Sequence, residues 1–239
     1  MKENDIKPSG SGAENKIENH DKQNTIKTII FITVLFAAVV ALTFIFRFAG
    51  LIKSIPLKIT VIYIIYVAMI ALVFIVCRIE KKRVRDLGFS KEKLCYQILI
   101  GIGIAVGLSL LVGVLPILIG GSGASLVGEK QTGAVSIVYS IVTALIFIGT
   151  LEELIFRGYM QTRINALTKH KFIGVLIAAA LFGLWHIING SWIQVAFAFL
   201  IGCVFGFCRA YLKNCSLLSV IIAHGLYDAL LVLIGIILL

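Results

Sequence analysis

The sequence predicts an all-α, polytopic membrane protein, a helix bundle of about seven transmembrane helices. Hydrophobic residues make up 59% of the 239 residues and charged residues only 14%. Apolar runs of about 20 residues, the length needed to cross a bilayer, recur along the chain. Lys and Arg lie mainly between these runs, so the net charge of +10 indicates membrane topology rather than binding to nucleic acid.

The chain divides into a short polar tail and one membrane domain. Residues 1–27 are polar and predict a disordered N-terminal tail. Residues 28–239 predict a transmembrane domain, with the chemically distinctive part at 135–239. The first apolar run has no small-residue cleavage site after it, so we interpret it as a span and not a signal peptide. The expected spans are approximately 28–47, 57–78, 95–119, 135–157, 172–189, 192–212 and 216–239.

The basic residues of the loops indicate an orientation. The loops after the second, fourth and sixth spans are rich in Lys and Arg, whereas those after the third and fifth have almost none. Because positive loops stay in the cytoplasm, this alternation predicts a cytoplasmic N-terminus. The first loop, with Arg47, Lys53 and Lys58, does not fit the alternation.

Two Gly-x-x-x-Gly spacings occur within the spans, at Gly103/Gly107 and Gly202/Gly206. Such pairs permit close contact between helices in a membrane. Glycine is also a common residue of membrane helices without a special contact. Both interpretations stay open for each pair.

Ionisable residues within the membrane gather in the last four spans. Once the tail and the loops are set aside, two histidines and three acids remain, all within or beside these spans: Glu152, Glu153, His186, His224 and Asp228. A charged group at the centre of a bilayer costs about 2.5–3.5 kcal/mol on insertion scales, so it indicates a functional site.

Helical spacing predicts how these groups face one another. Glu153 and Arg157 are four residues apart and therefore share a helix face on which they can pair. Glu152 lies about 100° around the helix, free to face a cavity, where it would suit general-base catalysis. His224 and Asp228 are also four residues apart, so Asp228 is expected to fix the tautomer of His224 or to contact a reacting oxygen.

Each feature also has a purely structural interpretation. The Glu153–Arg157 pair could be an ordinary ion pair, the paired glutamates a polar helix end, and each histidine a hydrogen bond between helices. Their joint occurrence favours a catalytic cavity. At about 1.5 Å per residue, however, the groups meet at one depth only if the fourth helix continues past Arg157. We therefore predict that this helix runs on to about Leu167.

Three motifs resemble those of the CPBP family of intramembrane proteases, which includes the CAAX prenyl endopeptidases and the bacterial Abi proteins. They occur in the family's order, and the first three spans carry none of them. Glu-Glu-x-x-x-Arg, Phe-x-x-x-His and His-x-x-x-Asn/Asp are matched by Glu152, Glu153 and Arg157, by Phe182 and His186, and by His224 and Asp228.

The resemblance implies hydrolysis of a peptide bond within a membrane cavity. Glu152 would be the base that activates water, with His186 beside it. His224 and Asp228 would stabilise the oxyanion, the Glu–Arg ion pair would preorganise the site, and Phe182 would contact the substrate. Asp228 replaces the Asn of the prenyl-protein branch, and an ionised Asp would repel an oxyanion. It would therefore have to be protonated or to act through His224.

The resemblance leaves the cofactor open. The family is often described as metalloproteases, and Glu152, His186 and His224 could ligate a divalent metal such as zinc. The chain has no His-Glu-x-x-His spacing, which carries zinc on one helix. A metal-free glutamate mechanism uses the same residues, and we favour it.

The expected substrate is a membrane-associated peptide or protein, and the expected location is a bacterial cell membrane. The substrate could be a prenylated CAAX protein or an unprenylated peptide such as a pheromone or bacteriocin leader. Two other functions are weighed: a non-catalytic protein of bacteriocin immunity, and a proton-coupled transporter in which Glu152, His186 and Asp228 form a relay.

Overall fold

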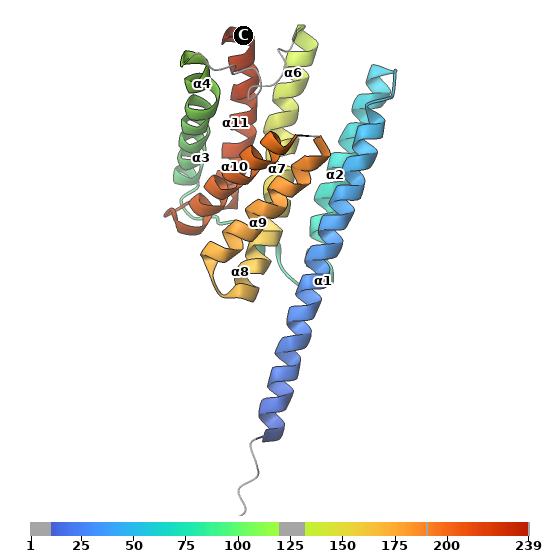
Figure 1. Cartoon of the computed structure of the whole chain (residues 1–239), viewed down its shortest axis with the longest axis vertical. Helices are drawn as coiled ribbons and strands as arrows, with labels where there is room; N and C mark the ends of the chain where they lie inside the picture. The colour runs from blue at the N-terminus through green and yellow to red at the C-terminus, as the bar shows by residue number, and fades with distance from the viewer. Residues whose placement is uncertain (1–10, 120–131, 190, 239) are drawn as a thin grey trace, which may run out of the picture.

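The computed structural model of the protein is a bundle of long helices (Figure 1). It describes residues 11–119, 132–189 and 191–238. Within these ranges every regular element is helical, and 7 helices are long and apolar enough to cross a membrane. The predicted fold class is therefore confirmed.

The seven spans are formed by single helices or by helical segments that follow one another without a break. A short 3-10 helix, η1, lies between the second and third spans. The elements are α1 (Ser11–Ala49), α2 (Ile55–Ile79), η1 (Val84–Leu87), α3 (Leu94–Leu108), η2 (Ser109–Val114), α4 (Leu115–Leu118), α6 (Ala134–Thr143), η3 (Ala144–Ile148), α7 (Gly149–Glu152), η4 (Glu153–Gln161), α8 (Thr162–Thr168), α9 (Lys171–Trp185), η5 (His186–Asn189), α10 (Trp192–Tyr211) and α11 (Leu217–Leu238).

The first helix begins earlier than expected. In the predicted tail, residues 1–10 lie outside the described residues, and 11–27 form the first turns of α1. The apolar part of α1 that could cross a membrane begins at Lys22. Disorder of the whole segment 1–27 therefore stays a prediction, and in the structure its described part is helical.

The fourth span is one continuous helical segment from Ala134 to Thr168, which confirms the predicted extension past Arg157. Residues 157–168 contain no proline, so nothing in this stretch breaks the helix. The segment ends where Lys169 adopts a left-handed conformation with φ of 58°. Two of its parts, η3 and η4, are π-helical, a wider turn that is frequent at functional sites.

The fourth span lies at the centre of the bundle. Its η4 segment packs against α2, α9, α10 and α11, and all of its residues are buried. The α9–α10 pair covers one side of it, and α1 with α2 stands on another (Figure 1). The residues of the first motif are thereby held between helices far apart in the sequence.

Two glycines bring the fourth span close to α11. A Cβ atom on Gly149 would lie 2.5 Å from the backbone N of Gly225, and one on Gly225 would lie 2.9 Å from the carbonyl O of Ala144. No side chain fits between backbones at these distances. This contact sets Glu152 and Glu153 opposite His224, one residue before Gly225.

The glycines of the two Gly-x-x-x-Gly spacings differ in how closely neighbouring helices approach them. A Cβ atom on Gly103 or Gly107 would meet nothing within 4 Å among the described atoms. Cβ atoms on Gly202 and Gly206 would lie 3.1 Å from Arg157 Nη2 and 2.8 Å from a Val175 methyl group. The spacing marks a close helix contact only in α10.

We expect Gly149→Ala to destabilise the bundle by about 1–3 kcal/mol, the usual cost of overpacking, because its Cβ atom would strike the backbone of α11. The predicted site should be disturbed as well, since Glu152 and Glu153 would move away from His224. The thermal midpoint in detergent measures the first effect. Gly107→Ala adds the same methyl group in open space, and an equal loss of stability in both variants would contradict the prediction.

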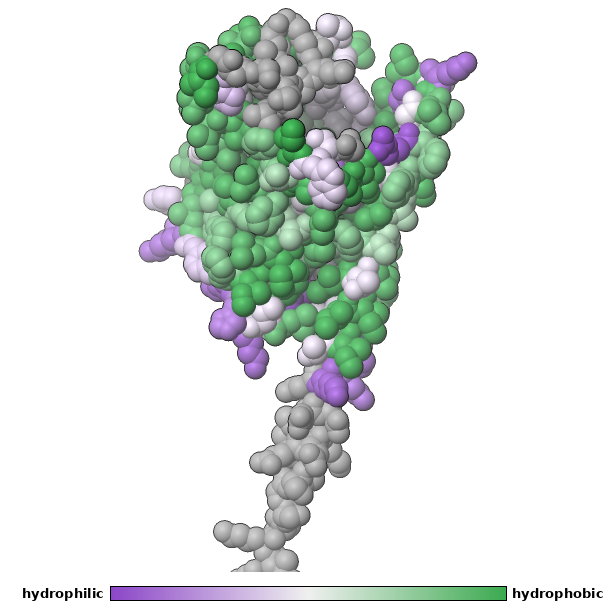
Figure 2. Space-filling view, viewed as in Figure 1, coloured by the Kyte–Doolittle hydropathy of each residue, from purple (hydrophilic) through white to green (hydrophobic). Residues whose placement is uncertain are grey.

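The basic junctions between helices meet at one end of the bundle. The guanidinium of Arg209 donates to the carbonyl O of Leu87 and to Thr162 Oγ1, both at 2.9 Å, and to the carbonyl O of Arg157. Arg163 Nε pairs with Glu80 at 3.1 Å and ties α8 to the end of α2. Figure 2 shows hydrophilic residues at the lower end of the bundle, below an apolar belt.

Candidate active site

Glu153 joins the two most important helices of the site. Its Oε1 atom accepts hydrogen bonds from Arg157 Nη1 and from His224 Nδ1, both at 2.8 Å. The first bond confirms the pairing predicted from the four-residue spacing. The second links the fourth span to α11. The Glu153 side chain is 0% exposed, so bulk water does not weaken these charged contacts.

Arg157 is enclosed by aromatic rings. Its guanidinium carbon lies 4.3 Å from the ring centroid of Phe182 and 5.5 Å from that of Phe205. Cation–π contacts of this kind are worth about 2 kcal/mol when desolvated, which offsets part of the cost of burying the charge. The absence of a side chain at Gly202 leaves room for the guanidinium.

The imidazole of His224 lies among three carboxylates. An ionised carboxylate only accepts hydrogen bonds, so the bond to Glu153 places a proton on Nδ1. The other nitrogen, Nε2, lies 3.6 Å from Glu152 Oε2 and 3.6 Å from Asp228 Oδ2. Asp228 was expected to fix the tautomer of His224 or to contact a reacting oxygen. In this geometry Glu153 fixes the tautomer, because it makes the short bond.

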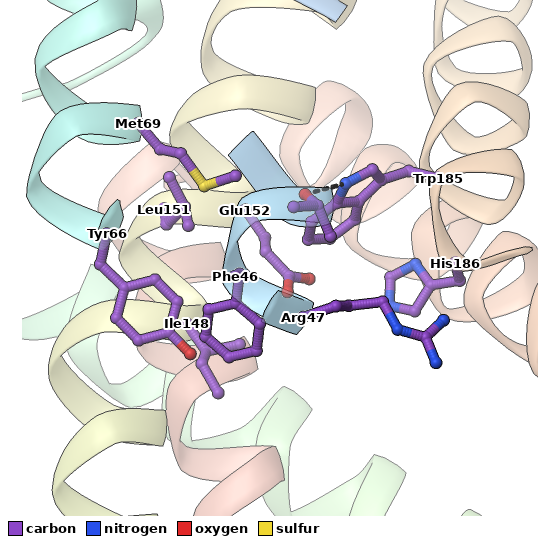
Figure 3. A pocket seen from close by; sticks show the side chains of 10 residues that line it. Phe46, Arg47, Tyr66, Met69, Ile148, Leu151, Glu152, Trp185 and His186 are labelled. Atoms are coloured by element: carbon purple, nitrogen blue, oxygen red, sulfur yellow. Dashed lines mark hydrogen bonds between the residues drawn. The ribbon is translucent and has the colours of Figure 1, made fainter. Parts of the chain in front are cut away.

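Glu152 faces a cavity, as its position on the helix predicts. Figure 3 shows its carboxylate directed into a space that is bordered by the imidazole of His186, the first residue of η5. His186 Nδ1 lies 2.9 Å from the carbonyl O of Phe182. Since a carbonyl accepts, Nδ1 carries the proton and Nε2 is left as an acceptor.

The cavity has a volume of about 210 Å³. Its walls come from α1, α2, the fourth span and the end of α9. They are formed by Thr43, Phe46, Arg47, Tyr66, Met69, Ile148, Leu151, Glu152, Trp185 and His186. Among these, Trp185 Nε1 donates to Thr43 Oγ1 at 2.9 Å, which ties α9 to α1 beside the cavity.

Asp228 lines a neighbouring cavity and not this one. The second cavity, of about 350 Å³, shares Phe46, Tyr66 and Ile148 with the first. These three side chains therefore stand between the Glu152 and Asp228 sides of the site. His224 Nε2 connects the two sides, since it lies near both carboxylates.

The first two spans contribute more than the sequence indicated. Thr43 and Arg47 on α1 and Tyr66 on α2 line the cavity with Glu152. None of them belongs to a motif, and apolar spans give no signal of which face meets a cavity. Of the three, only Arg47 stood out in the sequence, because it is a positive charge in the first loop, where the alternation of basic loops predicted none.

Phe182 is buried beside the charged groups of the site. It is 2% exposed and does not line the described cavity, and its expected contact with substrate stays a prediction. Its ring covers Arg157 and lies 4.6 Å from the imidazole of His186. In this position the ring supports the charged groups.

A resident metal ion does not fit the side chains as they are placed. Zinc ligands lie about 2.0–2.2 Å from the ion, and among the described residues no three His, Cys, Asp or Glu side chains are grouped to hold one. His224 Nδ1 is already bonded to Glu153. As they are placed, Glu152, His186 and His224 are therefore not grouped as the metal site that the resemblance allows.

Comparison with known families supports the resemblance inferred from the motifs. Residues 134–230 match the family model for type II CAAX prenyl endopeptidases, Rce1-like. Searches of the curated proteins and of the solved structures gave no match. The matched segment runs from the start of α6 into α11 and contains all three motifs. Residues 134–230 are therefore similar to the Rce1-like type II CAAX prenyl endopeptidase family, whose members are hydrolases acting on peptide bonds.

Proposed function

We propose that this protein is an intramembrane endopeptidase that hydrolyses a peptide bond in a membrane-associated protein or peptide. One observation carries the proposal. Glu152 and His186 line one cavity inside an apolar bundle, and a buried network of Glu153, Arg157 and His224 supports it from behind. We assign residues 28–239 to one membrane protease domain, with its chemical core at 135–239.

In the proposed reaction, Glu152 takes a proton from a water molecule in the cavity. The resulting hydroxide attacks the carbonyl carbon of the peptide bond, and the Nε2 lone pair of His186 accepts the second water proton as a hydrogen bond. Glu152 then gives its proton to the leaving amine when the C–N bond breaks. A positioned base contributes roughly 10²- to 10⁴-fold to such a rate.

His224 is the proposed donor to the oxyanion. Its Nδ1 proton is held by Glu153, so a donor at Nε2 requires the imidazolium form. The carboxylates of Glu152, Glu153 and Asp228 around the ring favour that positive charge. Asp228 then acts through His224, because it lies 3.6 Å from Nε2 and offsets the ring's charge. An oxyanion donor is typically worth about 2.7–4 kcal/mol.

We propose a multi-pass location in a bacterial cell membrane with a cytoplasmic N-terminus. Three basic junctions, after α2, after α8 and after α10, meet at the end of the bundle where α1 enters. The family match makes a prenylated CAAX protein one candidate substrate. An unprenylated leader peptide is the other candidate substrate. The proposed hydrolysis is the same for both.

Membrane peptidomics in the native host tests the function. Wild type is compared with Glu152→Gln and His224→Ala at equal protein levels. The matched control is Glu92→Gln, an exposed acid just before α3 that does not line the cavity. We expect one or more processed peptides to vanish in both site variants and to persist in the control. Unchanged peptides with an intact cellular phenotype would instead indicate a binding role, such as immunity.

A further inference from the structure

Arg47 places a positive charge beside the proposed catalytic groups. It lies in the last turn of α1, and its side chain extends past the Glu152 carboxylate toward His186 (Figure 3). Its Nη1 atom donates to the backbone carbonyl O of Ile188, two residues after His186. This bond fixes the guanidinium at the edge of the cavity, on the His186 side.

The charge of Arg47 has no partner of opposite sign in the described part of the chain. Arg157 is paired with Glu153 and Arg163 with Glu80, but no ion pair is formed by Arg47 among these residues. A guanidinium has five N–H donors in a planar fork. The Ile188 carbonyl occupies one nitrogen, and the exposed side chain leaves other donors accessible to a ligand.

The two charged residues of the cavity wall are Glu152 and Arg47. Glu152 has a proposed task in activating water, whereas Arg47 has none. At about 210 Å³ the cavity is smaller than the roughly 300–1,000 Å³ of most ligand pockets. An extended residue spans at most about 3.6 Å. In so small a cavity, the peptide bond at Glu152 and the group bound by Arg47 would therefore lie only a few residues apart in the substrate.

We propose that Arg47 binds a carboxylate of the substrate close to the bond that is cut. This inference rests on the proposed function and adds a specificity residue to it. Guanidinium and carboxylate match in shape and charge through two parallel hydrogen bonds. The carboxylate is either the C-terminus of the substrate or an acidic side chain near the cut. Binding it would hold the scissile carbonyl at a fixed distance from Glu152.

The test uses protein reconstituted in liposomes and a mixture of synthetic hydrophobic peptides of about 20 residues, the length of a membrane span. The mixture is prepared in three forms: with a free C-terminus, with an amidated C-terminus, and with Asn and Gln in place of Asp and Glu. Cleavage is scored by mass spectrometry for wild type, Arg47→Gln, Arg47→Lys and Lys53→Gln. Lys53 is an exposed cation between α1 and α2 that does not line the cavity.

We expect wild type to favour one carboxylate form by roughly 10- to 100-fold in kcat/KM, the range for a hydrogen bond to a charged group. Arg47→Gln should abolish this preference, mainly through KM, so that the charged form is cleaved no better than the neutral form. Arg47→Lys should restore part of the preference, and Lys53→Gln should match wild type. If amidation of the C-terminus lowers cleavage, Arg47 binds the terminal carboxylate. If replacement of Asp and Glu lowers cleavage, Arg47 binds an acidic side chain.

Two results would overturn the inference in distinguishable ways. If Arg47→Gln lowers cleavage of charged and neutral peptides equally, or of neither, Arg47 only anchors α1 to the end of α9. If wild type cleaves no peptide in any form while Glu152→Gln also leaves the native peptides unchanged, the proposed function itself fails.

Discussion

Glu152→Gln is expected to lower kcat by roughly 10²- to 10⁴-fold, the contribution of a general base, with little change in KM. The amide keeps the size of the side chain and its place in the cavity wall, but it cannot take a proton from water. Glu152 also makes no short bond to the buried network, since its closest charged contact is 3.6 Å from His224 Nε2. The fold should therefore be preserved.

Cleavage in proteoliposomes at saturating substrate measures this effect, with thermal unfolding in detergent as the check on folding. Glu92→Gln makes the same chemical change on an exposed acid and should leave kcat at the wild-type value. If Glu152→Gln kept more than about a tenth of the wild-type kcat, Glu152 could not be the base.

Arg157→Ala should lower the free energy of unfolding by about 3–5 kcal/mol, the cost of breaking a buried ion pair from one side. The variant leaves the Glu153 carboxylate enclosed without its cation, and it removes the guanidinium between Phe182 and Phe205. Activity should be lost as well, because Glu153 also holds His224. Unfolding by SDS titration in mixed micelles gives the free energy.

A variant without both charges separates two effects on stability: the loss of the ion pair, and the cavity that truncation of Arg157 leaves. The double variant Glu153→Gln, Arg157→Met should regain much of the lost stability, since no buried charge stays unpaired, yet remain inactive. Arg83→Ala is the control for an exposed pair. Arg83 is 66% exposed, lies 3.8 Å from Asp86, and such pairs contribute about 0–1 kcal/mol. An equal effect of Arg83→Ala and Arg157→Ala would contradict the prediction.

Several parts of the site follow from the sequence because they depend on one helix at a time. The Glu153–Arg157 pair lies within a single turn, so its four-residue spacing is enough to predict it. The direction of Glu152 follows from the same periodicity. The continuation of the fourth helix to Thr168 follows from the absence of a breaking residue and from the need to bring the site groups to one depth.

Other parts depend on how helices are rotated against one another, which local periodicity does not contain. The Glu153–His224 bond joins residues 71 positions apart, and the four-residue spacing of His224 and Asp228 gave no sign of this second carboxylate. Gly149 and Gly225 decide this contact, yet they lie outside every Gly-x-x-x-Gly spacing that the sequence displayed.

By itself, the sequence determined that this protein is a membrane helix bundle with one set of chemically active groups in its last four spans. Hydrophobic length and helical spacing carry that information. Only the tertiary structure decided that α1 and α2 complete the cavity, that Phe182 shields Arg157, and that Arg47 stands beside Glu152. An apolar helix has no sequence signal for the face that it turns toward a cavity, because close packing against its neighbours sets that rotation.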